Sequence, residues 1–146
     1  MEQKKFTSDV WGPNYWFFMH TLAYSYPNAP NAVTKRKYYD LIQNMPLFIP
    51  IPEMGNNFSR LLDKYPVTPY LDSRESFIRW INFIHNKVNL QLGKPEISLY
   101  ESIEKYYMNY LPKQIEMKET MHIRKHYIYY AIILVLFIII YILYKR

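Results

Sequence analysis

The sequence predicts an all-α protein, a four-helix bundle with a short fifth helix, followed by one C-terminal transmembrane helix. Three observations predict this fold class. Apolar residues recur at helical spacing between proline and glycine breaks, alternating strand patterns are absent, and a long uncharged run lies near the C-terminus. Half of the 146 residues are hydrophobic, which excludes a disordered chain, and this length is typical of one domain.

The first two helices are bounded by prolines and by a capping residue. The first is expected over residues 13–24, with Pro13 at a favourable position in its first turn. The second is expected to begin near Asn31, a good N-cap, and to run toward Met45. Between residues 46 and 52, three prolines exclude the interior of an α-helix.

The third and fifth helices are short. Pro52 is expected to open the third helix, since proline is favoured in a first helical turn. Ser98 and Glu101 have the spacing of a capping box, which predicts a fifth helix that runs through about Tyr110.

The fourth helix has the clearest signal. Asp72 and Glu75 have capping-box spacing at its start, and Gly93 is expected to close it. Its apolar residues recur at helical intervals and are Phe77, Trp80, Ile81, Ile84, Val88 and Leu92.

The C-terminal part of the chain predicts a membrane anchor. Residues 127–144 contain no charged side chain and would span about 27 Å as an α-helix at ~1.5 Å per residue. That length suits a thin bilayer such as the endoplasmic reticulum, with tyrosines at both interfaces. The N-terminus lacks the apolar core of a signal peptide. We therefore expect a tail-anchored, single-pass membrane protein whose N-terminal domain lies on the cytosolic side.

The chain is thus expected to have four segments. They are a helical domain over 1–112, a basic linker over 113–126, the transmembrane helix over 127–144 and a short basic tail over 145–146. The net charge of +6 is divided as +2 over residues 1–117 and +4 over residues 118–146. A basic membrane-proximal segment favours anionic lipid headgroups, so we expect a membrane partner and no nucleic-acid partner.

The chain contains no cysteine, which excludes disulfides, thiolate metal sites, iron–sulfur clusters and a cysteine nucleophile. No Glu-x-x-His or His-x-x-x-His pattern is present, and we expect no metal site. Phosphate-binding loops and the nucleophile elbow of hydrolases are absent as well.

A polar stripe lies on the fourth predicted helix. Asn82, His85, Asn86 and Asn89 share one side of it, although asparagine is a poor helix former. Two interpretations compete: a solvated polar face, or a polar wall that hydrogen-bonds a ligand. In the second, His20 of the first helix would meet His85 across the bundle.

Two stretches resemble the signatures of the Erv/ALR family of FAD-linked sulfhydryl oxidases. Residues 11–27 contain Trp11-Gly-Pro-Asn-Tyr-Trp16 and His20, and residues 77–95 contain His85-Asn86-Lys-Val-Asn89. Both occur in the family's order and at its separation. The resemblance covers roughly residues 11–110. Family members with a membrane segment are known from large DNA viruses, and the Ile-, Lys-, Asn- and Tyr-rich usage fits an AT-rich genome, so a virion membrane is a second expected location.

The resemblance implies that the domain over 1–112 binds FAD in the mouth of the bundle. Residues between 16 and 24 would pack around the flavin and adenine, residues 85–89 would supply polar contacts, and one lysine would approach the phosphates. A tyrosine would stack where the family usually has tryptophan. The implied cofactor-binding residues are Gly12, Trp16, His20, Tyr24, His85, Asn86, Asn89, Lys94 and Tyr106.

The resemblance also identifies what this chain lacks. The family reaction needs a Cys-x-x-Cys beside the flavin at the start of the third helix, where Ile51 and Met54 stand here. A common structural cysteine pair of the family corresponds to Asn82 and Leu99. A thioether has no proton to lose and forms no disulfide, and isoleucine has no redox chemistry. We therefore expect the family fold and FAD binding, but not thiol oxidation by the family mechanism.

Several interpretations remain open at this point. The chain is a pseudoenzyme that binds FAD as a homodimer or as a dimer with an active relative, or a sequence whose cysteines were replaced deliberately. A third interpretation is a different flavin chemistry, in which an external thiol, such as that of a partner protein, reaches the ring directly. A tail-anchored helical adaptor that binds protein and no flavin is the alternative from another functional class.

Overall fold

A computed structural model describes the backbone of residues 6–111 and 114–145, and the side chains of residues 6–111 and 125–145. The chain divides into two compact units, Met1–Met108 and Asn109–Arg146. In chain order the elements are α1 (Ser8–Tyr24), α2 (Ala32–Asn44), the 3-10 turn η1 (Met45–Phe48), α3 (Pro52–Lys64), the 3-10 turn η2 (Thr68–Tyr70), α4 (Arg74–Gln91), α5 (Leu99–Met108) and α6 (Gln114–Tyr144).

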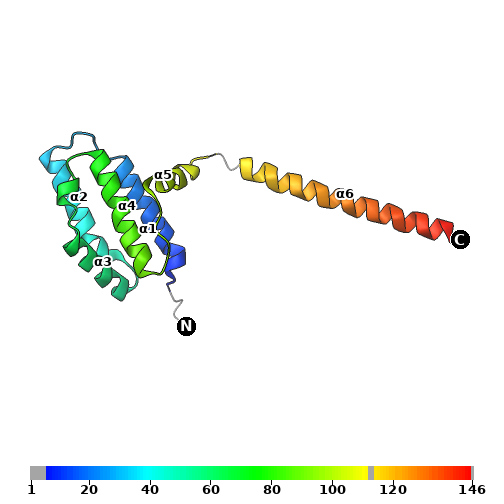
Figure 1. Cartoon of the computed structure of the whole chain (residues 1–146), viewed down its shortest axis with the longest axis horizontal. Helices are drawn as coiled ribbons and strands as arrows, with labels where there is room; N and C mark the ends of the chain where they lie inside the picture. The colour runs from blue at the N-terminus through cyan, green and yellow to red at the C-terminus, as the bar shows by residue number, and fades with distance from the viewer. Residues whose placement is uncertain (1–5, 112–113, 146) are drawn as a thin grey trace. The chain divides into compact units, whose positions relative to one another are not determined.

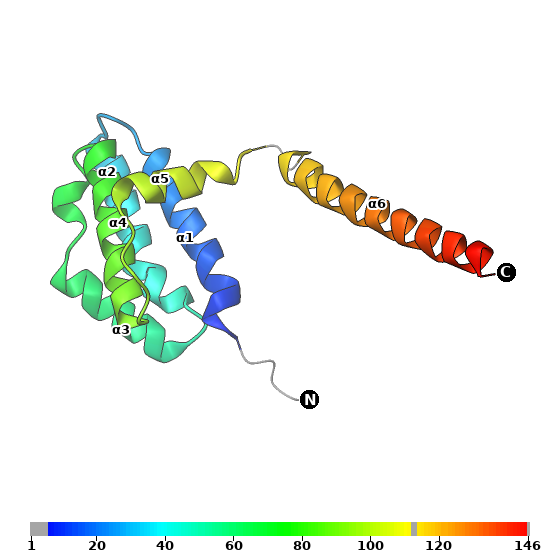
Figure 2. The same ribbon diagram turned by 45° about the vertical axis from the view of Figure 1, so that its right-hand side comes forward.

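The first unit is a bundle of α1 to α4, and α5 crosses one end of it (Figures 1 and 2). The segment between α4 and α5 runs back along the bundle before α5 begins (Figure 2). The part of the chain that the structure describes contains helices, turns and loops and no strand. The predicted all-α fold, a four-helix bundle with a short fifth helix, is therefore confirmed.

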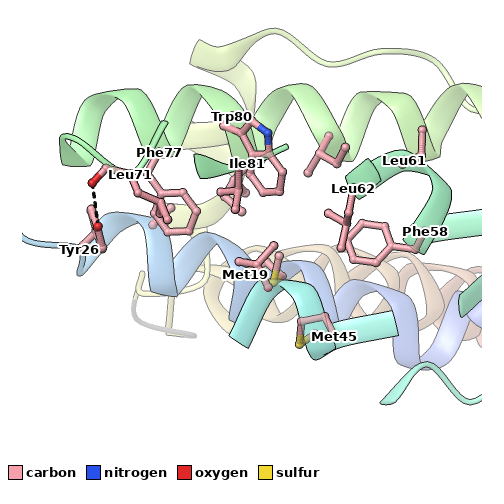
Figure 3. Close-up of a cluster of buried hydrophobic side chains, with 14 residues drawn as sticks. Met19, Tyr26, Met45, Phe58, Leu61, Leu62, Leu71, Phe77, Trp80 and Ile81 are labelled. Carbon is pink, nitrogen blue, oxygen red and sulfur yellow. Dashed lines mark hydrogen bonds between the residues drawn. The ribbon is translucent and has the colours of Figure 1, made fainter. Parts of the chain in front are cut away.

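The core lies between the four helices (Figure 3). Its largest fully buried side chains include Trp80, Tyr26 and Phe77. The polar ends of the first two are satisfied within the core. The Trp80 indole donates to the Tyr65 carbonyl at 3.2 Å, and the Tyr26 hydroxyl donates to the Leu71 carbonyl at 2.9 Å. Buried aromatic residues with such partners add apolar burial without the cost of an unpaired polar group.

Two predicted helix caps are confirmed and one was placed on the wrong residue. The side chain of Asn31 accepts from the Thr34 amide at 2.8 Å, and that of Ser98 accepts from the Glu101 amide at 3.1 Å. At α4 the cap is Ser73, not Asp72, because the Ser73 hydroxyl accepts from the amide of residue 76 at 3.2 Å. The Asp72 carboxylate instead accepts a hydrogen bond of 2.6 Å from the ammonium of Lys35 in α2 and forms an ion pair with it.

The predicted start of α1 was wrong, because the helix begins at Ser8 rather than at Pro13. Proline inside a helix loses one i→i−4 hydrogen bond, and near the N-terminus few such bonds are at stake. The first turns have contacts of their own. The Asn14 side chain donates to the Val10 carbonyl at 3.0 Å, and the rings of Trp11 and Tyr15 meet edge to face at 5.2 Å.

The proline-rich connection before α3 contains no α-helix, as predicted, although a 3-10 turn occupies its first half. Here the start of α3 packs tightly. A Cβ placed on Gly55 would lie 2.6 Å from the Pro46 carbonyl oxygen, so only glycine fits this position without a shift. The N-terminal end of α3, where Ile51 and Met54 lie, is therefore held against η1.

The second unit contains α6. The stretch Lys125–Tyr144 is long and apolar enough to cross a membrane, with a mean hydropathy of 2.5. Residues 114–126, which we expected to be a linker, belong to the same helix. The expected ends at residues 112, 113 and 146 lie outside the described residues, and the segment boundaries remain predictions.

Candidate functional site

The centre of the candidate site is a pair of histidines from α1 and α4. His20 Nε2 and His85 Nδ1 lie 3.3 Å apart, a hydrogen bond in which either nitrogen can donate. Burial lowers the pKa of His20 to about 4. The pKa of His85 falls to about 3, first because of burial and then because His20, Lys105 and Lys94 lie nearby. Both rings are therefore neutral at pH 7. In the hydrogen bond between them, one of the two nitrogens carries the proton and the other accepts it.

One ring nitrogen of His20 is buried without a hydrogen-bond partner among the described residues. This nitrogen is Nδ1, and the residue is 6% exposed. A buried polar atom without a partner costs free energy and is rare in native structures. Such an atom at the centre of a ring cluster indicates a place for a polar group of a ligand.

A flat aromatic surface adjoins the histidines. The Trp16 indole stacks on the His85 ring, with centroids 4.0 Å apart and planes 10° from parallel. The edge of Phe58 from α3 meets Trp16 at 6.3 Å. Because α1, α3 and α4 each supply a ring, the bundle itself fixes this surface, which suits a planar ligand.

Near its C-terminal end, α5 contacts α1 through tyrosine side chains. The Tyr24 and Tyr106 rings lie 4.5 Å apart, and the Tyr106 hydroxyl lies 3.1 Å from Thr21 Oγ1. Thr21 already donates its proton to the Phe17 carbonyl at 2.8 Å, so Tyr106 is the donor in the shared bond. Burial, followed by the neighbouring Tyr107 and Tyr106, raises the pKa of Tyr24 to about 12. The Tyr24 phenol is therefore protonated at neutral pH.

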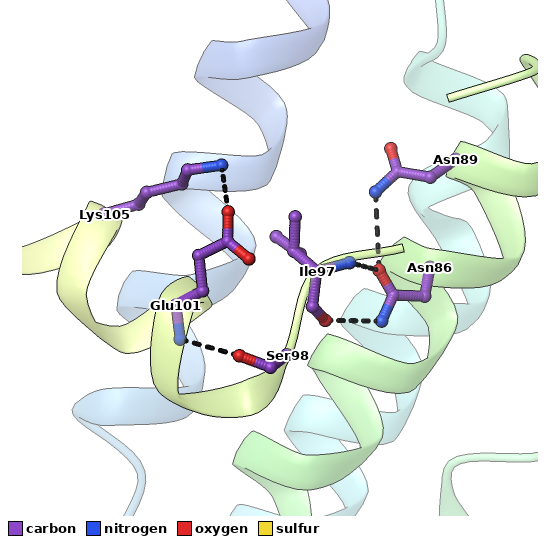
Figure 4. A network of polar contacts seen from close by, with 6 residues as sticks. All are labelled: Asn86, Asn89, Ile97, Ser98, Glu101 and Lys105. Carbon is purple, nitrogen blue, oxygen red and sulfur yellow. Dashed lines mark hydrogen bonds and ion pairs between the residues drawn. The ribbon is translucent and has the colours of Figure 1, made fainter. Parts of the chain in front are cut away.

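The asparagines of α4 hold the segment that follows the helix (Figure 4). Asn86 donates through Nδ2 to the Ile97 carbonyl at 2.8 Å and accepts from the Ile97 amide at 3.0 Å. The buried Asn89 donates to Asn86 Oδ1 at 3.4 Å, and its backbone carbonyl accepts from the Lys94 amide at 2.8 Å. The polar stripe is therefore neither a purely solvated face nor a bare ligand wall, since it positions the loop before α5.

Lys94 stands on that loop directly after Gly93. Gly93 has a φ of 68°, the left-handed conformation that glycine adopts without strain after a helix. The Lys94 ammonium lies 3.2 Å from the carboxylate of Asp9 in the first turn of α1. The lysine that the resemblance directs to a phosphate thus has a carboxylate as its partner in this structure.

The remaining predicted positions are less constrained. A Cβ on Gly12 would meet nothing within 4 Å, so no close backbone approach requires a glycine there. Ile51 is the N-cap residue of α3 and Met54 lies in its first turn, both partly buried. The side-chain oxygen of Asn82 is buried without a partner among the described residues. No group of three or more potential metal-ligating side chains was found within the part of the chain described.

Sequence reasoning missed the partners that come from other elements. Asp9, Thr21 and Ile97 each contact a predicted residue and were not singled out. For Thr21 a signal existed, since it follows Phe17 by four residues and precedes Tyr24 by three on one side of the helix. For Asp9 none existed, because the helix was expected to begin after it.

The fold is an all-α bundle. Aromatic and histidine side chains from α1, α4 and α5 pack together in it and form a surface suited to a flat ligand. The sequence model of the Erv1 / Alr family matches residues 13–109. The chain belongs to the Erv1 / Alr family.

Curated relatives include viral proteins. The chain is 34% identical over 107 residues to the probable FAD-linked sulfhydryl oxidase of Acanthamoeba polyphaga mimivirus, covering 73% of this chain and 75% of that protein. It is 31% identical over 110 residues to the FAD-linked sulfhydryl oxidase of African swine fever virus, covering 75% and 90%. The match with the mitochondrial FAD-linked sulfhydryl oxidase of Schizosaccharomyces pombe, at 33% identity over 84 residues, covers 58% of this chain and 46% of the relative.

Solved structures have the same fold. The core of yeast Erv1 aligns with a TM-score of 0.64 and 24% identity, covering 73% of this chain and 88% of that chain. The FAD binding domain of Erv1 from Saccharomyces cerevisiae aligns with the same score and identity, covering 70% and 95%.

Proposed function

We propose that this chain is a membrane-anchored, FAD-binding member of the sulfhydryl oxidase family that does not oxidise thiols by the family's dithiol reaction. The observation that carries this proposal is the contrast between two parts of the first unit. The paired histidines and the stacked indole belong to the two stretches that resemble the family's signatures, and Tyr106 of α5 meets Thr21 beside them. The start of α3, by contrast, carries Ile51 and Met54, and the chain has no cysteine at all.

The residues present fit a flavin dinucleotide. His20 offers a buried, unpartnered Nδ1 to a polar ring atom, while Trp16 and His85 offer a flat stacked surface. Lys94 offers a charge to a phosphate. When bound, FAD supplies a two-electron acceptor. The residues that would hold it are Gly12, Trp16, His20, Tyr24, His85, Asn86, Asn89, Lys94 and Tyr106.

Thiol oxidation by the family's route is not supported by this set of side chains. In that route, a pair of thiols loses two electrons and two protons to become a disulfide, and only thiolates carry out the attack. The methionine sulfur at position 54 has no S–H bond, and oxidation would convert it to a sulfoxide instead. The first unit would therefore bind the cofactor without the protein-borne electron donor that the family employs.

Membrane anchoring is the second part of the proposal. The apolar stretch Lys125–Tyr144 supports a single span, with Lys125 and Lys145 at its two ends. The proposed arrangement keeps the first unit on the cytosolic side. Protease digestion of intact microsomes tests it. Loss of the first unit is expected, and its protection would reverse the assignment.

A dimer is the expected assembly, either of two identical chains or of this chain with an active relative. Thiol-containing protein partners remain a prediction of the same kind. Light scattering of the purified chain in detergent, alone and mixed with a cysteine-containing relative, distinguishes the two assemblies by mass.

The colour of the purified full-length chain in detergent is the direct test of cofactor binding. Flavin absorption bands that remain after desalting are expected. A folded but colourless protein would favour the adaptor function, in which the helical domain binds protein only. Oxygen consumption with dithiothreitol is expected not to exceed that of an equal concentration of free FAD. Turnover above this level would show that an external thiol reaches the flavin directly.

A further inference from the structure

The lysines around the candidate site are all paired with carboxylates. The three pairs are Lys87–Glu96, Lys94–Asp9 and Lys105–Glu101, with N–O distances of 4.0, 3.2 and 2.9 Å. Two of these cations, Lys105 and Lys94, lie close enough to His85 to lower its pKa. Burial and His20 lower the pKa of His85 most, and Lys105 and Lys94 lower it further. The positive charge beside the rings is thus held by carboxylates that an anionic ligand must displace or share.

The pair between Asp9 and Lys94 differs from the other two. Lys105–Glu101 lies within one turn of α5, and Lys87–Glu96 joins α4 to the loop that follows it. Asp9, by contrast, lies in the first turn of α1, 85 positions away in sequence from Lys94. This pair alone among the three connects the beginning of the bundle to the loop after α4.

Hydrogen bonds hold the backbone of this loop, whereas the Lys94 side chain is exposed and forms its ion pair with the exposed Asp9. The Lys94 amide donates to the Asn89 carbonyl, and the Asn86 clamp on Ile97 holds the other end of the segment. The two charged side chains remain 53% and 83% exposed. An exposed ion pair adds little to stability, so its carboxylate can exchange for another anion without disturbing the backbone.

We propose that Asp9 is an electrostatic latch, a carboxylate that competes with phosphate oxygens for Lys94 and thereby limits the affinity of the site for a dinucleotide. This inference rests on the proposed FAD function. Binding of a diphosphate would exchange one anion for another at the lysine, and Asp9 would return to solvent. Asp9 acts through Lys94 and is a positioning residue rather than a ligand of the cofactor.

Titration of the full-length chain with FAD and with riboflavin, which lacks the phosphates, tests the latch. In low salt, Asp9→Asn is expected to lower the dissociation constant for FAD by about two- to fivefold, within the range of exposed ion pairs. Riboflavin affinity is expected to stay unchanged. The matched control is Asp72→Asn, which removes an exposed carboxylate paired with Lys35 at the other end of α4 and is expected to alter neither affinity.

A double variant distinguishes competition for Lys94 from direct repulsion between the Asp9 carboxylate and the phosphates of FAD. In a Lys94→Gln background, Asp9→Asn is expected to have no further effect on FAD affinity, because the competed group is gone. An unchanged or weaker FAD affinity in Asp9→Asn would overturn the latch, as would equal tightening for riboflavin or an effect that persists in Lys94→Gln. If the unsubstituted chain binds no FAD but Asp9→Asn does, the proposed cofactor function fails and the latch stands. If neither binds, both fall.

Discussion

Asn86 and Ile97 are joined by two hydrogen bonds that run in opposite directions between one side-chain amide and one backbone peptide group. The Asn86 amide nitrogen donates to the Ile97 carbonyl, and its oxygen accepts from the Ile97 amide. A side chain that pairs in this way replaces the partner that a strand or helix would give to an isolated loop peptide. Asn86 thus holds the end of the loop that carries Lys94, and the bond from the Lys94 amide to the Asn89 carbonyl holds its beginning.

The first prediction concerns this clamp. Asn86→Ala leaves both polar groups of Ile97 without their partner, and we expect it to lower the free energy of unfolding by about 1–3 kcal/mol. Chemical denaturation of the full-length chain measures the change. Asn28→Ala, in the exposed loop between α1 and α2, is the control and should stay within about 0.5 kcal/mol of the parent. Equal effects at both positions would show that the clamp does not stabilise the loop.

The second prediction concerns pH. The folded-state pKa values of His20 and His85, about 4 and about 3, lie below the ordinary histidine value of 6.5. The unfolded chain therefore binds more protons between these values and 6.5. The stabilising contribution is complete above pH 6.5 and is lost as the pH falls toward the folded-state values. Without added FAD, we expect the unfolding free energy to drop by on the order of 2–4 kcal/mol between pH 7 and pH 5.

A histidine variant distinguishes this pair from the other titrating groups. His20→Gln should flatten the dependence of stability on pH in this range. A steep loss of stability that persists in His20→Gln would place the responsible protons elsewhere.

The third prediction uses two glycines as a matched pair. A Cβ at Gly55 would lie 2.6 Å from the Pro46 carbonyl oxygen, whereas one at Gly12 would have nothing within 4 Å. We expect Gly55→Ala to destabilise the fold by about 1–3 kcal/mol through overpacking. Gly12→Ala should stabilise it by up to about 1 kcal/mol, because alanine is the better helix former. Thermal unfolding of both variants gives the comparison, and a shift of the same sign in both would contradict it.

The fourth prediction restores the missing redox pair. Ile51 and Met54 lie at the N-terminal end of α3, where a helix favours a thiolate. The combined substitution Ile51→Cys and Met54→Cys is expected to produce dithiothreitol-dependent oxygen consumption in the FAD-loaded chain. Ile51→Cys alone supplies one thiol and serves as the control. If the double variant forms its disulfide, as mass spectrometry would show, but gives no turnover, the pair does not reach the flavin.

The sequence predicted most of the fold because its helices end at strong local signals. Asn31 and Ser98 cap their helices as expected, and Pro52 opens α3. The error at α4 arose because aspartate and serine are both good caps. The hydrogen bond depends on backbone angles that spacing alone does not give, and Ser73 has the extended ones. At α1, a rule for proline in the first turn was applied to a proline further inside the helix.

The site was predicted less completely, for a related reason. Periodicity placed His85, Asn86 and Asn89 on one side of a helix, and one of the two interpretations of that stripe brought His20 to His85, as the structure does. Contacts such as Lys94 with Asp9, or Thr21 with Tyr106, depend on how far one helix slides along another. Hydrophobic patterning specifies which faces are buried, but it does not specify the axial registration of two helices to within one residue.

The resemblance assigns the family's structural cysteine pair to Asn82, within α4, and to Leu99, the first residue of α5, so such a pair would join the helices on both sides of the α4–α5 connection. Here that connection depends on the hydrogen bonds to Ile97 and on packing, and no bond in it can be reduced. The free energy of folding is therefore uncoupled from the thiol–disulfide potential of the surroundings. The same chain would keep its shape in a reducing cytosol and in an oxidising lumen, and glutathione would not act on it as a denaturant.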